Sequence, residues 1–260
     1  KRIQPARAKA RARAWKWGAA PQRATLDFDA TLVGSYSEKE GAAPNYKHGF
    51  GFHPLVVHLD ETREALAARL RPGNAGANTA QDHVELLDEA LAQLPLPTSA
   101  EDPERGLAVL VRADTAGATH AFVEAIVERG LEFSIGFDVT EPVRLAILEL
   151  PKAAWVDAIQ QDLQPRDGAW VAELTPCLDL SAWGAGTRAI GRREEPHPGA
   201  QFNLFDPDGY RHQVFITNSK DPDIAYLEAR HRGHARVEDR IRWGKALGLE
   251  NFPFSKFSSN

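Results

Sequence analysis

Alternating polar and apolar residues predict three consecutive strands in the first part of the chain. Residues 24–33 (ATLDFDATLV) alternate and include Thr and Val, which favour strands. Residues 49–59 and 65–70 follow as two further strands, separated by short polar turns. Strands joined in this way form an antiparallel meander. Because side chains alternate along a strand, Asp27 and Asp29 are expected to point to the same side.

Helix and strand patterns alternate after this meander. Residues 79–82 (TAQD) have the spacing of a capping box, and a helix is expected to follow. Its apolar stripe consists of Val84, Leu87, Leu91 and Leu94. Residues 106–113 (GLAVLVRA) form a nearly continuous apolar run, as in a strand covered on both faces, and Asp114 comes directly after it.

A helix over residues 117–129 and a buried strand over 131–137 complete this region. A meander followed by helix, strand, helix and strand predicts an α/β fold, a mixed sheet flanked by helices. This is the element order of a ribonuclease H-like fold.

The pattern of polar and apolar residues changes after this region. Short strands separated by Gly and Pro are expected at 169–175, 187–193, 202–205 and 212–217. They predict a mostly β insertion before the last core helix. That helix is expected over 221–247, with Asp221 as its cap and Gly248 as its stop. The predicted domains are a basic N-terminal arm (1–23), the first part of the core (24–139), the insertion (140–218) and the resumed core with the last helix (219–260).

Charge is distributed unevenly along the chain. The formal net charge is −5, but seven Lys or Arg residues fall within the first sixteen and no acid precedes Asp27. This basic arm suits contact with phosphates, although a solvated helix face would have the same composition. A second basic stretch, residues 230–245, surrounds Glu238 and Asp239.

Composition excludes several classes of protein. With 260 residues, 43% of them hydrophobic, the chain can bury a sizeable core. Its single cysteine, Cys177, excludes an internal disulfide and a multi-thiolate zinc cluster, which fits a reducing cytoplasm. No apolar run reaches the roughly 18 residues of a membrane span, so no membrane partner is expected. The chain contains no Met, which leads us to expect a fragment of a longer protein.

Three acids on three predicted elements suit a metal site. Asp29 lies within the first strand, Asp114 at the end of a buried strand, and Glu238 on the last helix. Carboxylates from separate elements can hold two Mg²⁺ ions about 4 Å apart, the usual arrangement for phosphoryl transfer. Asp114 could equally cap a turn, and Asp27, on the same face as Asp29, is an alternative first ligand.

The last helix places cations beside Glu238. Residues three, four and seven apart share a helix face. The side chains that share the face of Glu238 are His231, His234, Arg242 and Lys245. A carboxylate among cations and imidazoles suits a metal ligand with phosphate-contacting neighbours. A surface ladder of ion pairs is the structural alternative, and a zinc site of His231, His234 and Glu238 fits no usual spacing.

Several long strings resemble a known family. These are LDFDATLVGSYSEKEGA, GFGFHPLVVHLD, LRPGNAGANTA, RADTAGA and RHRGHARVEDRIRWGKALGLENFPF. They are similar to the catalytic region of bacterial insertion-sequence transposases of the DDE class, in the insertion-sequence family numbered thirteen-eighty. The resemblance places the catalytic acids at Asp29, Asp114 and Glu238, in agreement with the chemistry.

The resemblance also bears on the helix and on the insertion. In the wider superfamily a Tyr, an Arg, a Glu and a Lys recur on this helix; Glu238 and Lys245 keep the spacing, while His231 and His234 replace Tyr and Arg. Lys245 is thereby implied to contact DNA near the transposon end. In relatives an aromatic residue of a β-rich insertion holds a flipped base, but the sequence does not choose among three tryptophans, for which core packing is the alternative. These are Trp155, Trp170 and Trp183.

The expected activity is that of a DNA transposase. Asp29, Asp114 and Glu238 would hold two Mg²⁺ or Mn²⁺ ions for cleavage at transposon ends and strand transfer into target DNA. Arg242, Lys245, His231 and His234 would contact double-stranded DNA, and a homodimer would bring two ends together. A site- or structure-directed metal-dependent endonuclease and a domesticated, non-catalytic DNA-binding module are the alternatives.

Overall fold

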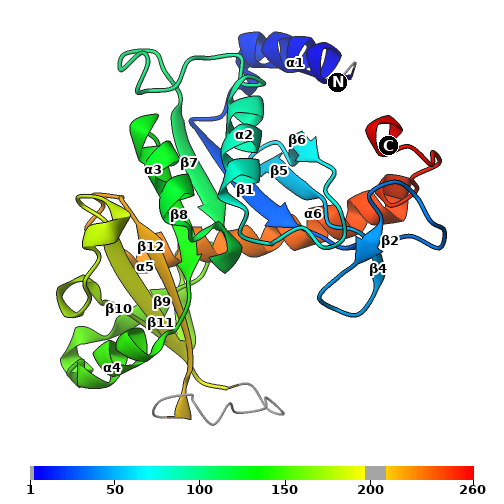
Figure 1. Ribbon diagram of the computed structural model, residues 1–260. Helices are drawn as coiled ribbons and strands as arrows, with labels where there is room; N and C mark the ends of the chain where they lie inside the picture. The colour runs from blue at the N-terminus through cyan, green and yellow to red at the C-terminus, as the bar shows by residue number, and fades with distance from the viewer. Residues whose placement is uncertain (1–2, 197–208) are drawn as a thin grey trace. The chain divides into compact units, whose positions relative to one another are not determined.

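Contacts divide the chain into two compact units. The computed structural model describes residues 3–196 and 209–260 (Figure 1). Unit 1 comprises the residues up to Val111, Arg129–Leu131 and Ala235–Asn260. Unit 2 comprises Arg112–Glu128 and Glu132–His234. These boundaries differ from the predicted domain boundaries. The predicted boundaries lie where the sequence pattern changes, whereas the two units are defined by contacts.

The sheet of unit 1 begins with the predicted meander. β1 (Arg23–Ala30) pairs antiparallel with β5 (Leu55–Leu59), and β5 pairs antiparallel with β6 (Glu64–Arg69). The strand order is β6-β5-β1-β7, where β7 is Ala108–Ala113. β7 starts in unit 1, and its last two residues belong to unit 2. The strands predicted over 65–70 and 106–113 are confirmed, and the strand predicted over 24–33 is present as far as Ala30.

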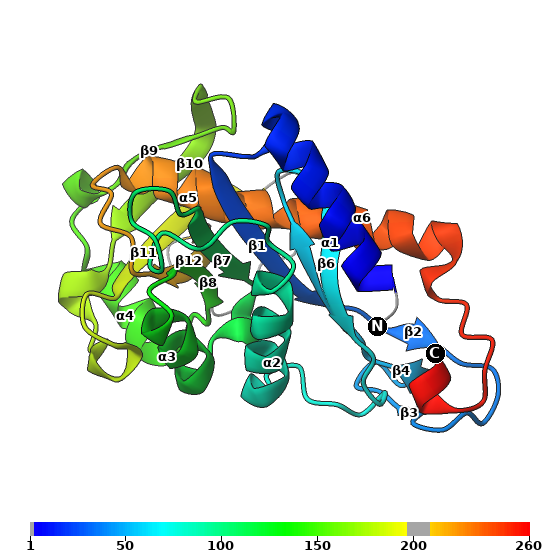
Figure 2. The ribbon, with the colours of Figure 1, turned by 90° about the horizontal axis from the view of Figure 1, so that it is seen from above.

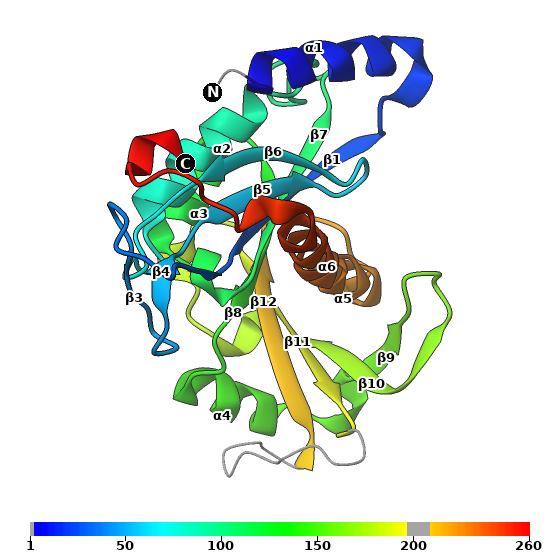
Figure 3. The same ribbon diagram turned by 90° about the vertical axis from the view of Figure 1, so that its right-hand side faces the viewer.

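Two helices cover opposite faces of the unit 1 sheet. On one face, Phe28 of β1 stacks on His83 of α2 (Ala80–Leu91), with ring centroids 6.1 Å apart. On the other face, Asp27 accepts a hydrogen bond from Arg240 of α6 (Arg236–Gly244). Figure 3 shows α2 and α6 on the two sides of β1 and β5. The prediction of a mixed sheet flanked by helices is therefore confirmed.

A second, smaller sheet corrects the prediction of one strand over 49–59. That segment forms β4 (Phe50–Phe52) and then β5, and β4 lies between β2 (Val33–Gly34) and β3 (Ala43–Pro44). Pro54 cannot donate a ladder hydrogen bond, so the strand breaks there. Gly51 allows the close approach of β2, because a Cβ atom at this position would lie 2.1 Å from the Val33 carbonyl oxygen.

The C-terminal segment packs on the small sheet. The ring centroids of Phe252 and Phe257 lie 5.2 and 6.0 Å from that of Phe52. The Glu40 carboxylate accepts a 2.9 Å hydrogen bond from the amide of Phe257, which begins the 3₁₀ turn η9 (Phe257–Ser259). The last residues of the chain are thus part of unit 1.

The basic N-terminal segment is a helix rather than an extended arm. α1 (Ile3–Ala14) continues into a short π-helical segment (Trp15–Ala19). Arg11 is buried and donates hydrogen bonds of 2.8 and 3.0 Å to Glu64, at the start of β6. Figure 2 shows α1 lying over this end of β6. Trp15 is also buried, so α1 is fixed to unit 1 at two positions.

The predicted capping box of α2 does not form. Thr79 occupies the cap position, but its hydroxyl donates a 3.2 Å hydrogen bond to the Gly76 carbonyl. The Asp82 carboxylate accepts from Arg69 and Arg71 instead of from a helix amide. Asp82 accepts from the two arginines because a charge-assisted hydrogen bond is stronger than a hydrogen bond from a neutral amide.

Unit 2 is built on a sheet of strand order β8-β12-β11-β10-β9. The neighbouring strands pair antiparallel, and α5 packs on β9 and β10. Its strands are β8 (Glu132–Phe137), β9 (Val156–Ile159), β10 (Pro165–Glu173), β11 (Arg188–Glu194) and β12 (Arg211–Thr217). Its helices are α3 (His120–Glu128), α4 (Glu141–Glu149) and α5 (Ile224–Arg232). Its 3₁₀ turns include η2 (Thr115–Gly117), η3 (Lys152–Ala154), η4 (Thr175–Cys177) and η5 (Ser181–Trp183).

The β-rich character expected for 140–218 is present, with two elements that the sequence reading missed, α4 and β9. The strand predicted at 202–205 lies outside the described residues. Because β12 pairs with β8, the strands of this segment extend the sheet that contains β8. The segment is thus continuous with a strand that the sequence reading assigned to the core.

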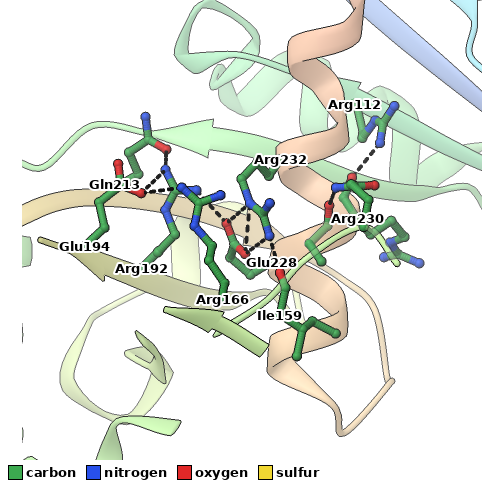
Figure 4. Close-up of polar contacts among 11 residues, drawn as sticks. Arg112, Ile159, Arg166, Arg192, Glu194, Gln213, Glu228, Arg230 and Arg232 are labelled. Atoms are coloured by element: carbon green, nitrogen blue, oxygen red, sulfur yellow. Dashed lines mark hydrogen bonds and ion pairs between the residues drawn. The ribbon is translucent and has the colours of Figure 1, made fainter. Parts of the chain in front are cut away.

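A charged network holds α5 on this sheet (Figure 4). Glu228 is buried and accepts hydrogen bonds from Arg192 of β11 (3.0 Å) and from Arg232 (3.1 Å). Arg232 also donates to the Ile159 carbonyl, and Arg112 donates to the Arg230 carbonyl at 2.5 Å. Helix α5 is therefore bonded through its side chains and its backbone to three strands.

The single helix predicted over 221–247 is interrupted. α5 ends at Arg232, the 3₁₀ turn η7 (Gly233–Ala235) follows, and α6 continues into a π-helical segment (Lys245–Leu249). Glycine has a low helix propensity, which explains a break at Gly233. Asp223, not Asp221, caps α5 by accepting from the amide of Tyr226 at 2.9 Å.

Within the described residues, no helix is both long enough and apolar enough to span a membrane.

Candidate active site

β1 presents two acids to α6, and their surroundings differ. Asp27 is completely buried, and its carboxylate accepts a 3.3 Å hydrogen bond from Arg240. Arg240 also donates to the carbonyl and carboxylate oxygens of Asp60. Asp29 is only half-buried, because it lies two residues further along the strand and nearer its carboxyl end. Asp27 therefore anchors α6, whereas Asp29 is open to a neighbouring pocket.

Asp29 and Glu238 line the same pocket. This cavity of about 430 Å³ lies between the carboxyl end of β1 and α6, and all of its lining residues belong to unit 1. They are Asp29, Ala30, Thr31, Glu238, Ile241, Arg242 and Lys245. The structure thus brings together two of the three predicted acids and two of the four predicted DNA-contacting residues.

Apolar packing and ion pairs fix α6 beside the pocket. Val237 and Ile241 pack against Val56 of β5 in a buried cluster. Arg236 donates a 3.1 Å hydrogen bond to Asp60, one turn before Arg240. With these residues turned to the sheet, Glu238 is exposed. The orientation of the Glu238 carboxylate therefore follows from the packing of its helix neighbours.

Two cations stand at the pocket. Lys245 donates a 2.7 Å hydrogen bond to the Leu32 carbonyl, which holds its ammonium group close to the end of β1. Arg242 forms a 2.5 Å ion pair with Asp239, and both side chains are largely exposed. An anionic ligand in the pocket would therefore meet positive charge beside the two carboxylates.

The buried side of β1 and β5 also perturbs a histidine. His58 pairs in register with Asp27. Burial lowers the pKa of His58 from 6.5 to about 4, and the positive charge of Arg240 contributes in the same direction. At neutral pH His58 is therefore uncharged and adds no positive charge beside Asp27 and Arg240.

Asp114 lies in unit 2, at the start of the 3₁₀ turn η2. It directly follows β7 and is exposed, and its carboxylate accepts a 3.0 Å hydrogen bond from the amide of Ala116. Gly136 of β8 permits the close approach of this turn: a Cβ atom there would lie 2.9 Å from the Thr115 nitrogen and 3.0 Å from the Asp114 carbonyl carbon. Asp114 therefore caps the turn, which is the structural alternative given for it, and its side chain remains exposed.

The two histidines of the predicted helix face, His231 and His234, belong to unit 2, whereas Glu238 belongs to unit 1. His231 stacks on Phe215 with a centroid separation of 4.4 Å, and its Nδ1 lies 2.9 Å from the Ser134 hydroxyl. Burial lowers the pKa of His231 well below 6.5, helped by the charge of neighbouring His234. An uncharged, packed ring is unsuited to a phosphate contact, so we assign His231 to the packing of unit 2.

The tryptophans of the insertion pack within unit 2. The guanidinium carbon of Arg193 lies 4.4 Å from the ring centroid of Trp155 and 5.2 Å from that of Trp170. Trp183 makes edge contacts with His120 and Phe137. These surroundings match the structural alternative given for each tryptophan.

No complete metal site is formed by the described part of the chain. Within residues 3–196 and 209–260, no three His, Cys, Asp or Glu side chains are grouped closely enough to hold a metal ion. Asp29 and Glu238 supply carboxylate oxygens, the donors that Mg²⁺ and Mn²⁺ prefer. These two residues fit as part of an oxygen ligand set, to which a third donor must be added.

Sequence reading missed the residues that anchor α6. Arg236 and Arg240 are one turn apart and reach Asp60, while Arg240 also reaches Asp27. Their i,i+4 spacing was visible in the sequence, but it predicts only a shared helix face. The acids that face them lie in β1 and directly after β5, and no local pattern identifies such partners.

Comparison with known proteins gives a family, and a transposase is among the similar solved structures. That structure is a piggyBac transposase synaptic complex with hairpin DNA, with a TM-score of 0.47 and 9% sequence identity. The alignment covers 84% of this chain and 40% of the transposase chain, so this chain spans less than half of that protein's length. No protein of curated function matches. The family model described as "Transposase DDE domain group 1" matches residues 3–260, and the chain therefore belongs to this family of DDE transposases.

Proposed function

We propose that this chain is the catalytic part of a transposase that cleaves DNA at the ends of a mobile element and joins those ends to target DNA. The proposed catalytic carboxylates are Asp29, Asp114 and Glu238. The observation that carries the proposal is the pocket of unit 1, where Asp29 and Glu238, from opposite ends of the chain, meet beside Arg242 and Lys245. Membership of the DDE transposase family supports the reaction class.

The three carboxylates are proposed to hold two divalent cations, Mg²⁺ or Mn²⁺. Such ions would activate the attacking oxygen and neutralise charge on the phosphate during the displacement. Asp29 and Glu238 would bind through oxygens at the pocket, and Asp114 through the carboxylate oxygen that faces outward from its turn. Asp27 is not proposed as a ligand, because its carboxylate is buried against Arg240.

The DNA backbone is proposed to enter the same pocket. Lys245 and Arg242 would contact its phosphates and so bring the scissile phosphodiester to the carboxylates. Half-buried His234 is proposed as a further phosphate contact from unit 2, whereas His231 is not. Because two element ends must be joined, a homodimer is proposed as the assembly that carries out strand transfer.

Cleavage and joining of labelled DNA carrying the element's terminal sequence tests this function. Full-length protein is expected to nick and join this DNA only with Mg²⁺ or Mn²⁺. Asp29→Asn, Asp114→Asn and Glu238→Gln are each expected to lower the cleavage rate about 100-fold or more, because each removes a charged ligand. Joined products would separate a transposase from a simple endonuclease.

Asp239→Asn is the matched control, since Asp239 is next to Glu238 on α6, is exposed and does not line the pocket. It is expected to keep activity within about twofold. Binding of Mn²⁺, followed by its electron paramagnetic resonance signal, gives a readout independent of cleavage. Full activity of Asp29→Asn or Glu238→Gln would overturn the assignment of the pocket.

A further inference from the structure

Helix α1 carries basic residues on two opposite faces. Residues four apart lie on one side of a helix, so Arg7 and Arg11 share one face, while Lys9 and Arg13 share the other. Lys16 follows Arg13 by three residues, in a segment whose backbone remains helical at this position, and joins the second face. The two faces have different surroundings.

The first face is neutralised inside unit 1. Arg11 forms a two-bond contact with Glu64 and donates a 2.6 Å hydrogen bond to the Gln93 carbonyl. Arg7 lies 3.6 Å from the same carboxylate. These contacts and the buried ring of Trp15 hold the helix on the sheet, and they fix which side of α1 faces solvent.

The second face is exposed and uncompensated. Lys9, Arg13 and Lys16 are all exposed, and no acid occurs before Asp27 in the sequence. In the part of the chain that the structure describes, none of the three forms an ion pair. The guanidinium of Arg13 lies 5.6 Å from the ring centroid of exposed Trp17, which limits its freedom. We call Lys9, Arg13 and Lys16 the α1 stripe.

We propose that the α1 stripe is a surface that binds the phosphate backbone of double-stranded DNA. The protein has a net charge of −5, yet three of its cations lie on one face of a fixed helix, with no acid beside them in sequence. The local electrostatic potential at this face is therefore suited to a polyanion. Because the opposite face of α1 is fixed to unit 1, the helix already holds the three cationic residues in place. Binding to phosphates therefore costs little conformational entropy beyond that of the lysine side chains.

This surface is separate from the pocket of unit 1. α1 precedes β1, whereas the pocket lies at the carboxyl end of that strand. Lys9, Arg13 and Lys16 do not line the pocket, and they lie on the face of α1 opposite to Arg11, which bonds to Glu64 of β6. The stripe would therefore contact DNA outside the pocket. The inference rests on the proposed function only in taking DNA as the ligand.

The test measures binding of the full chain to a 30-base-pair duplex of mixed sequence, in EDTA, over a range of salt concentrations. Without divalent ions no cleavage occurs, so binding and catalysis can fail independently. Replacing the stripe by Lys9→Gln, Arg13→Gln and Lys16→Gln together is expected to weaken binding roughly 10-fold to 100-fold. The slope of log affinity against log salt should become shallower by about 2.7, or about 0.9 for each lost contact.

Two further variants make the result specific. Exchanging Lys for Arg and Arg for Lys within the stripe keeps the charge and is expected to keep the salt slope. Arg105→Gln removes an exposed cation from an acidic loop of unit 1 and is expected to change the slope by less than 0.5. An unchanged slope in the triple variant overturns the proposal, as does an equal change per charge in Arg105→Gln. Circular dichroism confirms that each variant is folded.

Discussion

Both units fasten a helix to a sheet with arginine and carboxylate groups, but they use the faces of the helix differently. In unit 1, Arg240 of α6 bonds to Asp27 and Asp60, while Glu238, two positions away, is left at the pocket with Asp29. One helix therefore serves as an anchor on one side and as a source of a functional group on the other.

In unit 2, the carboxylate on the anchored helix α5, that of Glu228, takes part in the anchor itself. Glu228 is 3% exposed and accepts from both Arg192 and Arg232. A buried ion pair is stable only when its geometry and hydrogen bonds compensate for lost hydration. The comparison shows that burial distinguishes the anchoring acids from the proposed catalytic ones: Asp27 and Glu228 are buried against arginines, whereas Asp29, Asp114 and Glu238 keep access to solvent or a pocket.

Breaking the network of unit 2 should have the largest effect on stability. Glu228→Gln removes the carboxylate that pairs with Arg232 and the nearer of the two that pair with buried Arg192, and we expect a loss of about 4 kcal/mol in the free energy of unfolding. Urea denaturation measures the loss. Glu149→Gln, at an exposed position of α4, is the matched control and should change stability by less than about 0.5 kcal/mol. A loss below about 1 kcal/mol for Glu228→Gln would contradict the anchoring role.

Removing the anchor of unit 1 should have a slightly smaller effect. Arg240→Met keeps the aliphatic stem but removes the ion pair between Arg240 and the buried Asp27 carboxylate, which we expect to cost about 3 kcal/mol. Arg236→Met removes a cation from the same helix, where the side chain is 46% exposed, and should cost less than about 1 kcal/mol. Adding Asp27→Asn should recover part of the Arg240→Met loss, and failure to do so would argue against a direct pair.

His58 should make unit 1 sensitive to acid. The pKa of His58 is lowered from 6.5 in the unfolded chain to about 4 in the folded protein, mainly by burial. The unfolded state therefore binds more protons between these values, so stability is complete above pH 6.5 and falls as the pH decreases to about 4. The loss is at most about 3 kcal/mol.

The variant His58→Gln removes this titration and should flatten the dependence of the melting temperature between pH 7 and 4.5, compared with the unmodified protein. Parallel curves for the two proteins would show that His58 does not contribute. Because carboxylates titrate in both proteins, the difference between the curves isolates the histidine.

The smallest effect on stability is expected at the pocket itself. The Arg242–Asp239 pair is largely exposed, so Arg242→Gln should change the free energy of unfolding by less than about 0.5 kcal/mol. The same change should weaken DNA binding by a few fold and reduce its salt dependence, as expected for one lost phosphate contact. Arg242→Lys keeps the charge and should retain that salt dependence. Equal DNA binding by both variants would remove Arg242 from the proposed interface.

Much of unit 1 could be predicted because its signals are local. The alternation in β1 and the apolar run of β7 identify strands directly, and helical spacing relates Glu238 to Arg242 and Lys245. The choice between Asp27 and Asp29 could not be made in this way, since a period of two places both on one face. The structure distinguishes the two residues by the contact of Asp27 with Arg240, and that contact joins distant parts of the chain.

The break between α5 and α6 was also beyond local reasoning. A single glycine within an otherwise helical pattern is usually tolerated, so Gly233 did not predict the 3₁₀ turn. His231 lies before this turn and stacks on Phe215 of unit 2, although its spacing from Glu238 fits a continuous helix. Helical spacing thus relates the pocket residues within α6, but it does not predict the surroundings of His231.

Gly136 shows how strongly one absent methyl group can constrain a chain. A side chain at this position would displace the turn that carries Asp114, by at least a few tenths of an ångström. In a library of random substitutions, position 136 should therefore accept almost nothing, although it touches no ligand and bears no reactive atom. Evolutionary intolerance at that residue would reflect the placement of a neighbour's carboxylate rather than any chemistry of its own.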